Sequence, residues 1–312
     1  MYLLFGGGGF IGRHVCDILE RDRIPFSIVT LRPDVNLRRQ YSQIQQIVRA
    51  SELDQTLLRD LLDQASSVIY MAGHSKPSSF QASPWLAVRD EVEPVFTTIA
   101  TIAELAPEKN VVFISSAGSI YGDSPERHDE NSPTLPISAY GLSKLQIENA
   151  LGFLQRTRGL DCKILRVTNP VGRHQSVENH GLVSVCLRRA LEKKPIAIYG
   201  SLETRRDYLD GDDLAEAIVR VAAASDKPGG VWNVGQGRSH SIREVLETIE
   251  TTLGEPLEIV HQDRRGYDVE VVEVSIDKFM ADYRWAPSRD LKTIVTNLRD
   301  YLVSANSKPM PQ

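Results

Sequence analysis

A tyrosine and a lysine, Tyr140 and Lys144, stand four residues apart in the run Ser138-Ala-Tyr-Gly-Leu-Ser-Lys. Residues at positions i and i+4 lie on the same face of an α-helix, so the two side chains can meet. An ammonium group beside a phenol favours the phenolate and can draw the pKa of a tyrosine from about 10 toward neutrality. Such a tyrosine can exchange a proton with a sugar or alcohol hydroxyl. The same spacing also occurs on ordinary amphipathic helices, where a half-buried tyrosine adjoins a solvated lysine. A catalytic role for the pair therefore needs support from a second motif in the sequence.

A run of four glycines near the start of the chain provides that feature. It contains the spacing G-x-x-G-x-x-G between the apolar stretch 2–5 and an apolar helix predicted over 10–21. A dinucleotide fingerprint requires this context, because the pyrophosphate must meet bare backbone at the N-terminus of a helix. A bound nicotinamide dinucleotide would exchange the hydride that accompanies the proton. The residues predicted to hold its pyrophosphate are Gly6, Gly9, Phe10, Ile11 and Gly12.

The end of the second predicted strand, residues 25–30, bears on the form of the cofactor. An Asp or Glu about 20 residues beyond the glycines would bind the ribose hydroxyls of NAD. The strand tip here carries no acid, and Arg32 follows it. A guanidinium group at this place suits a 2′-phosphate. The sequence therefore leaves NAD and NADP open and favours NADP slightly, although Arg32 as a solvated loop residue explains the pattern nearly as well.

Composition narrows the class of protein. The 312 residues are 41% hydrophobic and 25% charged, as in ordinary globular enzymes. A net charge of −5 gives no indication of binding to nucleic acid or to an anionic membrane. No apolar run approaches the ~20 residues that a membrane span needs. Three widely spaced cysteines fit neither a disulfide framework nor a metal site, so we expect no metal and a cytoplasmic location.

Apolar periodicity predicts strands and helices that alternate over the first half of the chain. This alternation predicts an α/β fold with a doubly wound parallel sheet. After residue 169 the pattern changes. We predict a dinucleotide-binding lobe over residues 1–168, to which part of 206–235 returns, and a smaller, discontinuous substrate lobe over 169–312. The predicted strands are 2–5, 25–30, 44–48, 67–72, 110–115, 162–167, 196–199, 230–234 and 257–261, and the predicted helices are 10–21, 54–64, 84–105, 139–158, 181–192, 211–224, 241–253 and 288–303.

The glycine turn, a serine-rich fifth strand and the Tyr140–Lys144 pair follow one another at distances typical of one family. The chain resembles the extended short-chain dehydrogenase/reductases of the NAD-dependent epimerase/dehydratase family, which act on nucleotide-activated sugars. The resemblance covers nearly the whole chain. It implies a Rossmann-type lobe, a bound nicotinamide dinucleotide and a homodimer built on two long helices per subunit. The segments that carry it are 6–12, 111–122, 139–145, 165–170, 205–210 and 265–268.

The resemblance assigns roles by position. Tyr140 is placed like the general acid/base, and Lys144 like the residue that holds the nicotinamide ribose and lowers the tyrosine pKa. Ala72 and Gly73, at the end of the fourth strand, are placed to contact the cofactor.

The family's third catalytic residue marks a departure. It is a Ser or Thr four residues before the Tyr-Gly pair that begins at Tyr121, and Ala117 occupies that position. The hydroxyl could come from Ser116, which we favour slightly, or from Ser119.

The substrate side also matches the family piece by piece. Asn169 is placed like the amide that contacts the sugar diphosphate, and Arg206 and Arg265 like the arginines that bind its phosphates. Tyr199 could stack on the nucleobase, and an ordinary core or surface role fits it equally well. Glu91 stands where the family usually has an asparagine, which changes the hydrogen bonding expected near the cofactor.

Three functions follow from these features. The first is an NAD(P)-dependent 4-epimerase of a nucleotide-diphosphate sugar, acting through a transient 4-keto sugar. The serine-rich strand and the Asn-Pro-Val-Gly segment at 169–172 resemble those of the 4-epimerases. The second is an NADPH-dependent reductase of a nucleotide-diphosphate-4-keto-6-deoxy sugar, which Arg32 favours. A dehydratase is disfavoured, because Gly118 and Ser119 stand where those members carry two acids. The third is a dinucleotide-binding protein without catalysis, against which the Tyr140–Lys144 pair argues.

Overall fold

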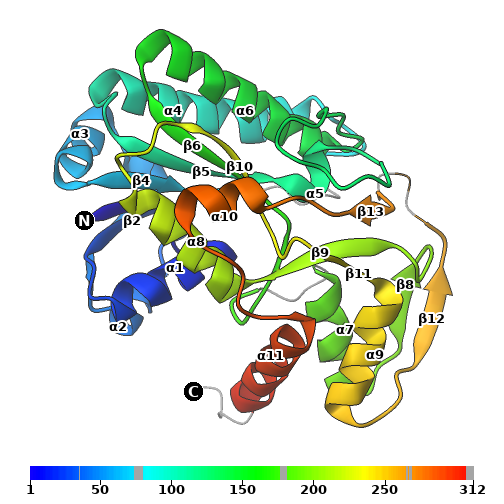
Figure 1. The fold of residues 1–312 in the computed structure, drawn as a ribbon. Coiled ribbons are helices and arrows are strands. Elements are labelled where there is room, and N and C mark those ends of the chain that lie inside the picture. The colour runs from blue at the N-terminus through cyan, green and yellow to red at the C-terminus, as the bar shows by residue number, and fades with distance from the viewer. Residues whose placement is uncertain (35, 74–79, 176–180, 265, 267–268, 307–312) are drawn as a thin grey trace.

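The computed structural model describes residues 1–34, 36–73, 80–175, 181–264, 266 and 269–306 (Figure 1). Its largest unit is a sheet of seven parallel strands in the order β10-β6-β5-β4-β1-β2-β3. The predicted α/β fold with a doubly wound parallel sheet is confirmed. The strands are β1 (Tyr2–Phe5), β2 (Phe26–Thr30), β3 (Ile44–Arg49), β4 (Ser67–Tyr70), β5 (Asn110–Ser116), β6 (Asp161–Val167) and β10 (Gly230–Val234).

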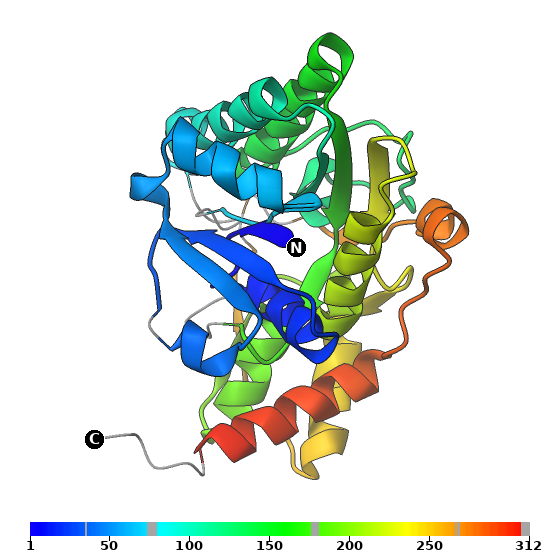
Figure 2. The same ribbon diagram turned by 90° about the vertical axis from the view of Figure 1, so that its left-hand side faces the viewer.

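Helices cover both faces of this sheet (Figures 1 and 2). Successive side chains of a strand point to opposite faces, so Leu4 packs with α1 and α8 while Leu3 packs with α3, α4 and α6. Burial on both faces explains why the strands read as continuous apolar runs in the sequence. The covering helices are α1 (Phe10–Arg21), α3 (Gln55–Gln64), α4 (Glu93–Leu105), α6 (Ala139–Arg158) and α8 (Gly211–Ala223).

Capping side chains fix the N-termini of α3 and α6. Asp54 caps α3 as predicted, because its carboxylate accepts a hydrogen bond of 2.8 Å from a main-chain N–H of the first turn. Ser138 caps α6 in the same way through the N–H of Gly141, and Gly159 ends α6 in the left-handed conformation. Because α6 starts directly after its N-cap residue Ser138, Tyr140 lies in the first turn of the helix.

The helix predicted over 84–105 is the main departure from the expected elements. A π-helical turn, η2 (Val88–Val92), precedes α4, which begins only at Glu93. Pro94 lies in the first turn of α4 and has no N–H to donate to the preceding turn, so regular α-helical hydrogen bonding is interrupted there. The wider turn carries Glu91 into the interior, where its side chain is buried.

The remaining strands form two small sheets, beside which three helices share a core (Figure 1). Strand β9 pairs with β7, β11 and β13, and β8 pairs with β12. Helix α10 packs beside β10, at the edge of the large sheet. The strands are β7 (Asn169–Val171), β8 (Ile196–Tyr199), β9 (Arg205–Asp210), β11 (Ser239–Ser241), β12 (Ile259–Gln262) and β13 (Val271–Val272), and the helices are α7 (Leu182–Leu191), α9 (Ile242–Leu253), α10 (Asp277–Tyr283) and α11 (Leu291–Asn306).

Other predicted bounds shift by a few residues where side chains compete with the helix. The last helix, predicted from residue 288, begins at Leu291. The Ser288 hydroxyl is bound to Asp213 at 2.7 Å, and Asp290 accepts the N–H of Thr293 at 2.8 Å, so the cap forms later in the chain. Within the described residues, sequence periodicity also missed eight short elements, which are α2 (Leu37–Gln40), η1 (Ala50–Glu52), α5 (Ala117–Ile120), α10, β7, β9, β11 and β13.

Two further observations concern the class of protein. No helix within the described residues combines the length and the apolar character that a membrane crossing requires. Cys16, Cys162 and Cys186 are all buried and carry free thiols, as small apolar residues of the interior.

Candidate active site

The glycine turn joins β1 to α1 directly beside the end of β4. Gly6 has a φ of +86°, and a Cβ there would lie 2.7 Å from the main-chain nitrogen of Ala72. A Cβ at Gly12 would lie 2.2 Å from the carbonyl oxygen of Gly6. Only glycine fits these close approaches. The turn therefore holds bare backbone against Ala72, just beyond the end of β4.

The first turn of α1 is open to a ligand. Gly9 is the N-cap residue, and no side chain there accepts a bond from the helical N–H groups. Bare N–H groups at a helix N-terminus are suited to an anion such as a pyrophosphate. The turn, the helix terminus and the parallel sheet thus fit a dinucleotide, with Phe10 and Ile11 as the first residues of α1.

Beyond β2, the chain carries both signs of charge. Arg32 is exposed, as expected for a residue that would meet a ligand phosphate or water. The guanidinium of Arg13 binds the carboxylate of Asp34 at 2.7 Å and the carbonyl of Gly8 at 3.1 Å. Thr30 ends the strand, so no acid occupies the tip itself. Sequence reasoning did not foresee the Arg13–Asp34 pair, because the two residues lie on different elements.

Tyr140 and Lys144 meet on one face of α6. The Lys144 ammonium lies 5.5 Å from the centre of the Tyr140 ring and 5.6 Å from that of Phe113 on β5. Lys144 is buried. Burial lowers the pKa of Lys144. The charges of Tyr140 and Glu91 raise it by more than burial lowers it, so the pKa lies above its ordinary value. The lysine is therefore held as a cation beside the phenol.

Glu91 completes this cluster from η2. One of its carboxylate oxygens lies 3.0 Å from the Lys144 ammonium, and both side chains are buried. The sequence marked Glu91 as an acid in place of the family's asparagine, but it gave no indication that the carboxylate would reach the lysine. The π-helical turn that brings it there has no sequence period of its own.

Both candidate serines lie at the end of β5. The strand ends at Ser116, and α5 begins at Ala117, so the chain turns where the family's hydroxyl residue was expected. The Ser116 hydroxyl lies 3.3 Å from that of Ser119. Ser116 is buried and Ser119 is partly exposed. A Cβ at Gly141 would lie 2.2 Å from the carbonyl oxygen of Ser119, so this turn packs directly on the helix that carries Tyr140.

Asn169 comes to the same place from β7. A Cβ at Gly118 would lie 3.7 Å from its amide oxygen, which puts the amide beside the serine turn. The amide nitrogen donates a hydrogen bond of 3.0 Å to the carbonyl of Asp207. Burial raises the pKa of the Asp207 carboxyl to about 7, and the N–H groups of Gln236 and Gly237 counteract that rise.

The other predicted substrate residues lie farther along the C-terminal half. Arg206 on β9 donates to the carbonyls of Arg205, Val269 and Glu270 at 2.8, 2.6 and 3.2 Å. Tyr199 ends β8 and is 42% exposed, so its ring can be reached from solvent. Arg265 lies outside the described residues.

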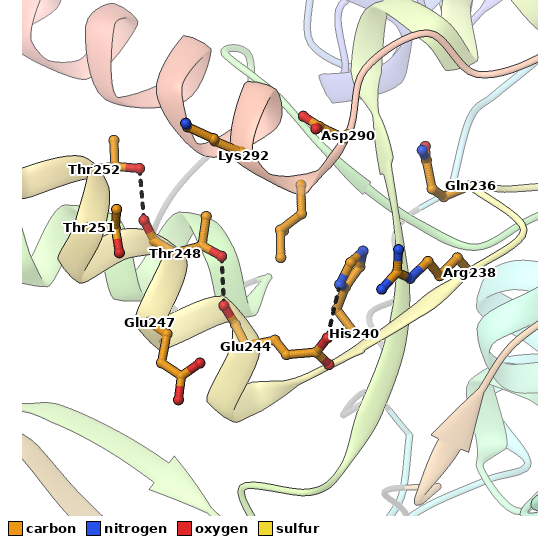
Figure 3. Close-up of a pocket in the computed structure, with 11 residues that line it drawn as sticks. Gln236, Arg238, His240, Glu244, Glu247, Thr248, Thr251, Thr252, Asp290 and Lys292 are labelled. Atoms are coloured by element: carbon orange, nitrogen blue, oxygen red, sulfur yellow. Dashed lines mark hydrogen bonds and ion pairs between the residues drawn. The ribbon is translucent and has the colours of Figure 1, made fainter.

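A separate groove opens between β11, α9 and the start of α11 (Figure 3). The residues that line it include His240, which faces Glu244, and Arg238 and Lys292 from neighbouring elements. Within the described part of the chain, none of the predicted site residues lines this groove. The residues that the sequence predicts to be catalytic lie instead around Tyr140.

Several known proteins resemble this chain in sequence. A family model described as the NAD dependent epimerase/dehydratase family matches residues 2–235. A UDP-glucose 4-epimerase of Azospirillum brasilense is 30% identical over 312 residues, covering 92% of this chain and 87% of the relative. A dTDP-4-dehydro-6-deoxyglucose reductase of Escherichia coli is 27% identical and covers 92% of each chain.

Solved structures give the same fold. A UDP-glucose 4-epimerase of Thermus thermophilus in complex with NAD superposes with a TM-score of 0.85 at 25% identity, covering 97% of this chain and 99% of the other. A UDP-glucose 4-epimerase of Thermotoga maritima with UDP-glucose has a TM-score of 0.88 at 23% identity, covering 98% and 99%. At 23% identity, the similarity to the Thermotoga maritima structure concerns the fold alone.

Proposed function

We infer the activity from one premise: the chain belongs to the NAD-dependent epimerase/dehydratase family. The protein is an enzyme of the nucleotide-sugar epimerase or reductase type that uses a nicotinamide dinucleotide. We propose that it interconverts a nucleotide-diphosphate sugar and its 4-epimer through a transient 4-keto sugar. The observation that carries the proposal is the Tyr140–Lys144 pair, which lies beside the serine turn at Ser116 and Ser119. A UDP-glucose 4-epimerase has the same fold.

The residues of the chain would divide the chemistry among them. A bound nicotinamide dinucleotide would supply the hydride acceptor and donor for the sugar carbon. Tyr140 takes the proton of the 4-hydroxyl, and the Lys144 cation stabilises the phenolate that this step requires. A serine hydroxyl donates a hydrogen bond to the same sugar oxygen. The glycine turn and the N-terminus of α1 hold the pyrophosphate of the dinucleotide, next to Ala72 and Gly73.

Binding of the substrate falls to the other predicted residues. Asn169 lies beside the serine turn, where its amide can contact the sugar diphosphate. Arg206 and Arg265 would supply the positive charge that a diphosphate needs in a chain of net negative charge, and Tyr199 would stack on the base. We accordingly assign dinucleotide binding to residues 1–168, with part of 206–235, and sugar-nucleotide binding to residues 169–312.

A 4-keto-sugar reductase is the second candidate function. The absence of an acid at the tip of β2 and the exposed Arg32 favour NADPH, which a reductase must exchange at every turnover. The similarity to the reductase of Escherichia coli supports a reductase function. An epimerase instead recycles a cofactor that stays bound.

Cofactor content and redox stoichiometry together distinguish the two. The protein is incubated with UDP-glucose without added cofactor, and the sugar is followed by NMR while the cofactor released by denaturation is identified. An epimerase should carry bound NAD⁺ and form the 4-epimer without consuming reductant. Oxidation of NADPH in step with reduction of dTDP-4-dehydro-6-deoxyglucose would establish the reductase instead. Turnover of free glucose as fast as of UDP-glucose would contradict both.

Replacing Arg32 by alanine tests the form of the cofactor. We expect the Kd of NADPH to rise about tenfold or more, because a hydrogen bond between charged groups is lost, and the Kd of NADH to change little. Both constants can be measured by nicotinamide fluorescence. Arg59→Ala, an exposed arginine on α3, serves as the matched control. Equal changes for the two cofactors would make Arg32 an ordinary loop residue.

We also propose that the enzyme is a homodimer built on α4 and α6. These helices pack side by side on one face of the sheet. Leu142 and Phe153 on α6 are 42% and 50% exposed, and their separation of eleven residues puts them on one side of the helix. A second copy of this chain would cover that apolar face.

Phe153→Glu should convert the dimer to a monomer, because it places a charge in the apolar contact. Light scattering coupled to size exclusion measures the mass. Val260→Glu on β12 removes another exposed apolar side chain and should leave the dimer intact. A monomeric unaltered protein, or a dimer that survives Phe153→Glu, would argue against this interface.

We further propose a cytoplasmic location, which the three buried free thiols support.

A further inference from the structure

The ion pair between Glu91 and Lys144 is the most deeply buried charge pair next to Tyr140 in the described structure. The two side chains are 1% and 7% exposed, and the nitrogen–oxygen distance is 3.0 Å. A buried carboxylate stabilises a partner cation only where the geometry is fixed. The surroundings of Glu91 therefore decide what the pair can do.

Four parts of the chain hold the pair in place. The π-helical turn η2 presents Glu91 inward, and α6 presents Lys144 from the other side. A Cβ at Gly73, just beyond β4, would lie 2.9 Å from the Glu91 carboxylate and 3.5 Å from the Lys144 ammonium. The Phe113 ring of β5 lies 5.6 Å from the same ammonium. The carboxylate and the ammonium thus occupy a site closed by backbone and by an aromatic ring.

The charges around Lys144 are arranged asymmetrically. On its own helix it faces Tyr140, and Glu148 one turn farther on, whose carboxylate is bound by Arg166 of β6 at 2.8 Å. From β4, the Tyr70 phenol faces Glu91, and burial together with that carboxylate raises the pKa of Tyr70 to about 12. Glu148 is already neutralised by an arginine, so Glu91 is the carboxylate that compensates Lys144.

A lysine ammonium has three hydrogens to donate. Glu91 accepts one of them and leaves the other two for Tyr140 and the proposed nicotinamide ribose. A negative charge at 3.0 Å also weakens the positive field that the ammonium exerts on the phenol. An asparagine at this position would orient the lysine without opposing its charge.

We propose that Glu91 is a positioning residue for catalysis: it anchors the Lys144 ammonium and moderates the positive charge that Lys144 presents to Tyr140. This inference rests on the proposed function, because it concerns the same proton transfer. It gives the departure at Glu91 a role in setting the pH at which the enzyme works.

Glu91→Gln tests the charge while keeping the length of the side chain. The phenolate becomes easier to form beside an uncompensated ammonium, so the acid limb of kcat/KM should move to lower pH by about one unit. The alkaline limb should also move down, because burial then opposes the Lys144 cation with less compensation. Binding of NADH, measured by fluorescence without substrate, should weaken several-fold. Glu93→Gln, an exposed acid two residues away, should change neither.

Glu91→Asp keeps the charge but shortens the reach. We expect it to retain the pH limbs of the unaltered enzyme and to weaken NADH binding alone. A uniform loss of activity at every pH in Glu91→Gln, with limbs and NADH binding unchanged, would overturn the inference and leave Glu91 a structural residue. If the unaltered protein neither binds NADH nor turns over nucleotide sugars, the proposed function itself fails, which is a distinct result.

A stability measurement covers the case in which Glu91→Gln does not fold. Lys144→Met leaves the Glu91 carboxylate buried without its cation, and should lower the melting temperature. Adding Glu91→Gln to Lys144→Met removes both charges and should restore most of that loss. No recovery in the double variant would show that the two residues are not coupled and would overturn the proposal.

Discussion

Replacing Tyr140 by phenylalanine should lower kcat by at least about a hundredfold, the usual effect of losing a general acid/base. The change deletes one oxygen and keeps the ring that lies 5.5 Å from the Lys144 ammonium. The packing of the first turn of α6 depends on Ser138 and Gly141, which stay in place. The loss should therefore appear in kcat, with NADH binding and the melting temperature near those of the unaltered protein.

Steady-state kinetics with UDP-glucose, or with a keto sugar for the reductase, measures this effect. Tyr199→Phe is the matched control, because it deletes a phenol oxygen at an exposed position on β8. That control should leave kcat unchanged, because it keeps the ring and deletes an oxygen that takes no part in the proposed proton transfer. Turnover of Tyr140→Phe close to that of the unaltered enzyme would remove Tyr140 from the proton transfer.

Sequence pattern was sufficient for the parts of the structure that local rules determine. The bounds of β1, α1, α6 and β10 agree with the predicted ones, because each combines an apolar period with a glycine turn or a cap. The glycine turn, the pair on α6 and the serine-rich strand end were all visible as short motifs. Each lies within one element and its adjoining turn.

Contacts between distant elements could not be predicted in the same way. Glu91 and Lys144 are separated by 53 residues, and they meet because a π-helical turn shifts the face that η2 presents. The helical turn α5 brings the hydroxyl of Ser119 back to that of Ser116, a contact that the alternation of side chains along a strand does not produce by itself. In both cases a short irregular turn, without a period of its own, decides which side chains meet.

The two serines should be unequal, and we expect Ser119→Ala to lose most of its kcat. The sequence favoured Ser116 slightly. In the structure Ser116 is the buried partner, whereas Ser119 is partly exposed and its carbonyl adjoins the backbone next to Tyr140. A hydroxyl that meets a substrate oxygen must be accessible and within about 2.6–3.2 Å of it. Ser116, 3.3 Å from Ser119, would then orient that hydroxyl from behind.

Single and double alanine variants measure this arrangement. Ser119→Ala should reduce kcat by about tenfold to a hundredfold, and Ser116→Ala only several-fold, because the second removes an orienting contact and leaves the donor. The double variant should resemble Ser119→Ala, since a support has no effect once the supported group is gone. The reverse order would assign the donor to Ser116. Full activity in both single variants would mean that proton transfer needs only Tyr140 and Lys144, because no hydroxyl of this turn would then reach the substrate.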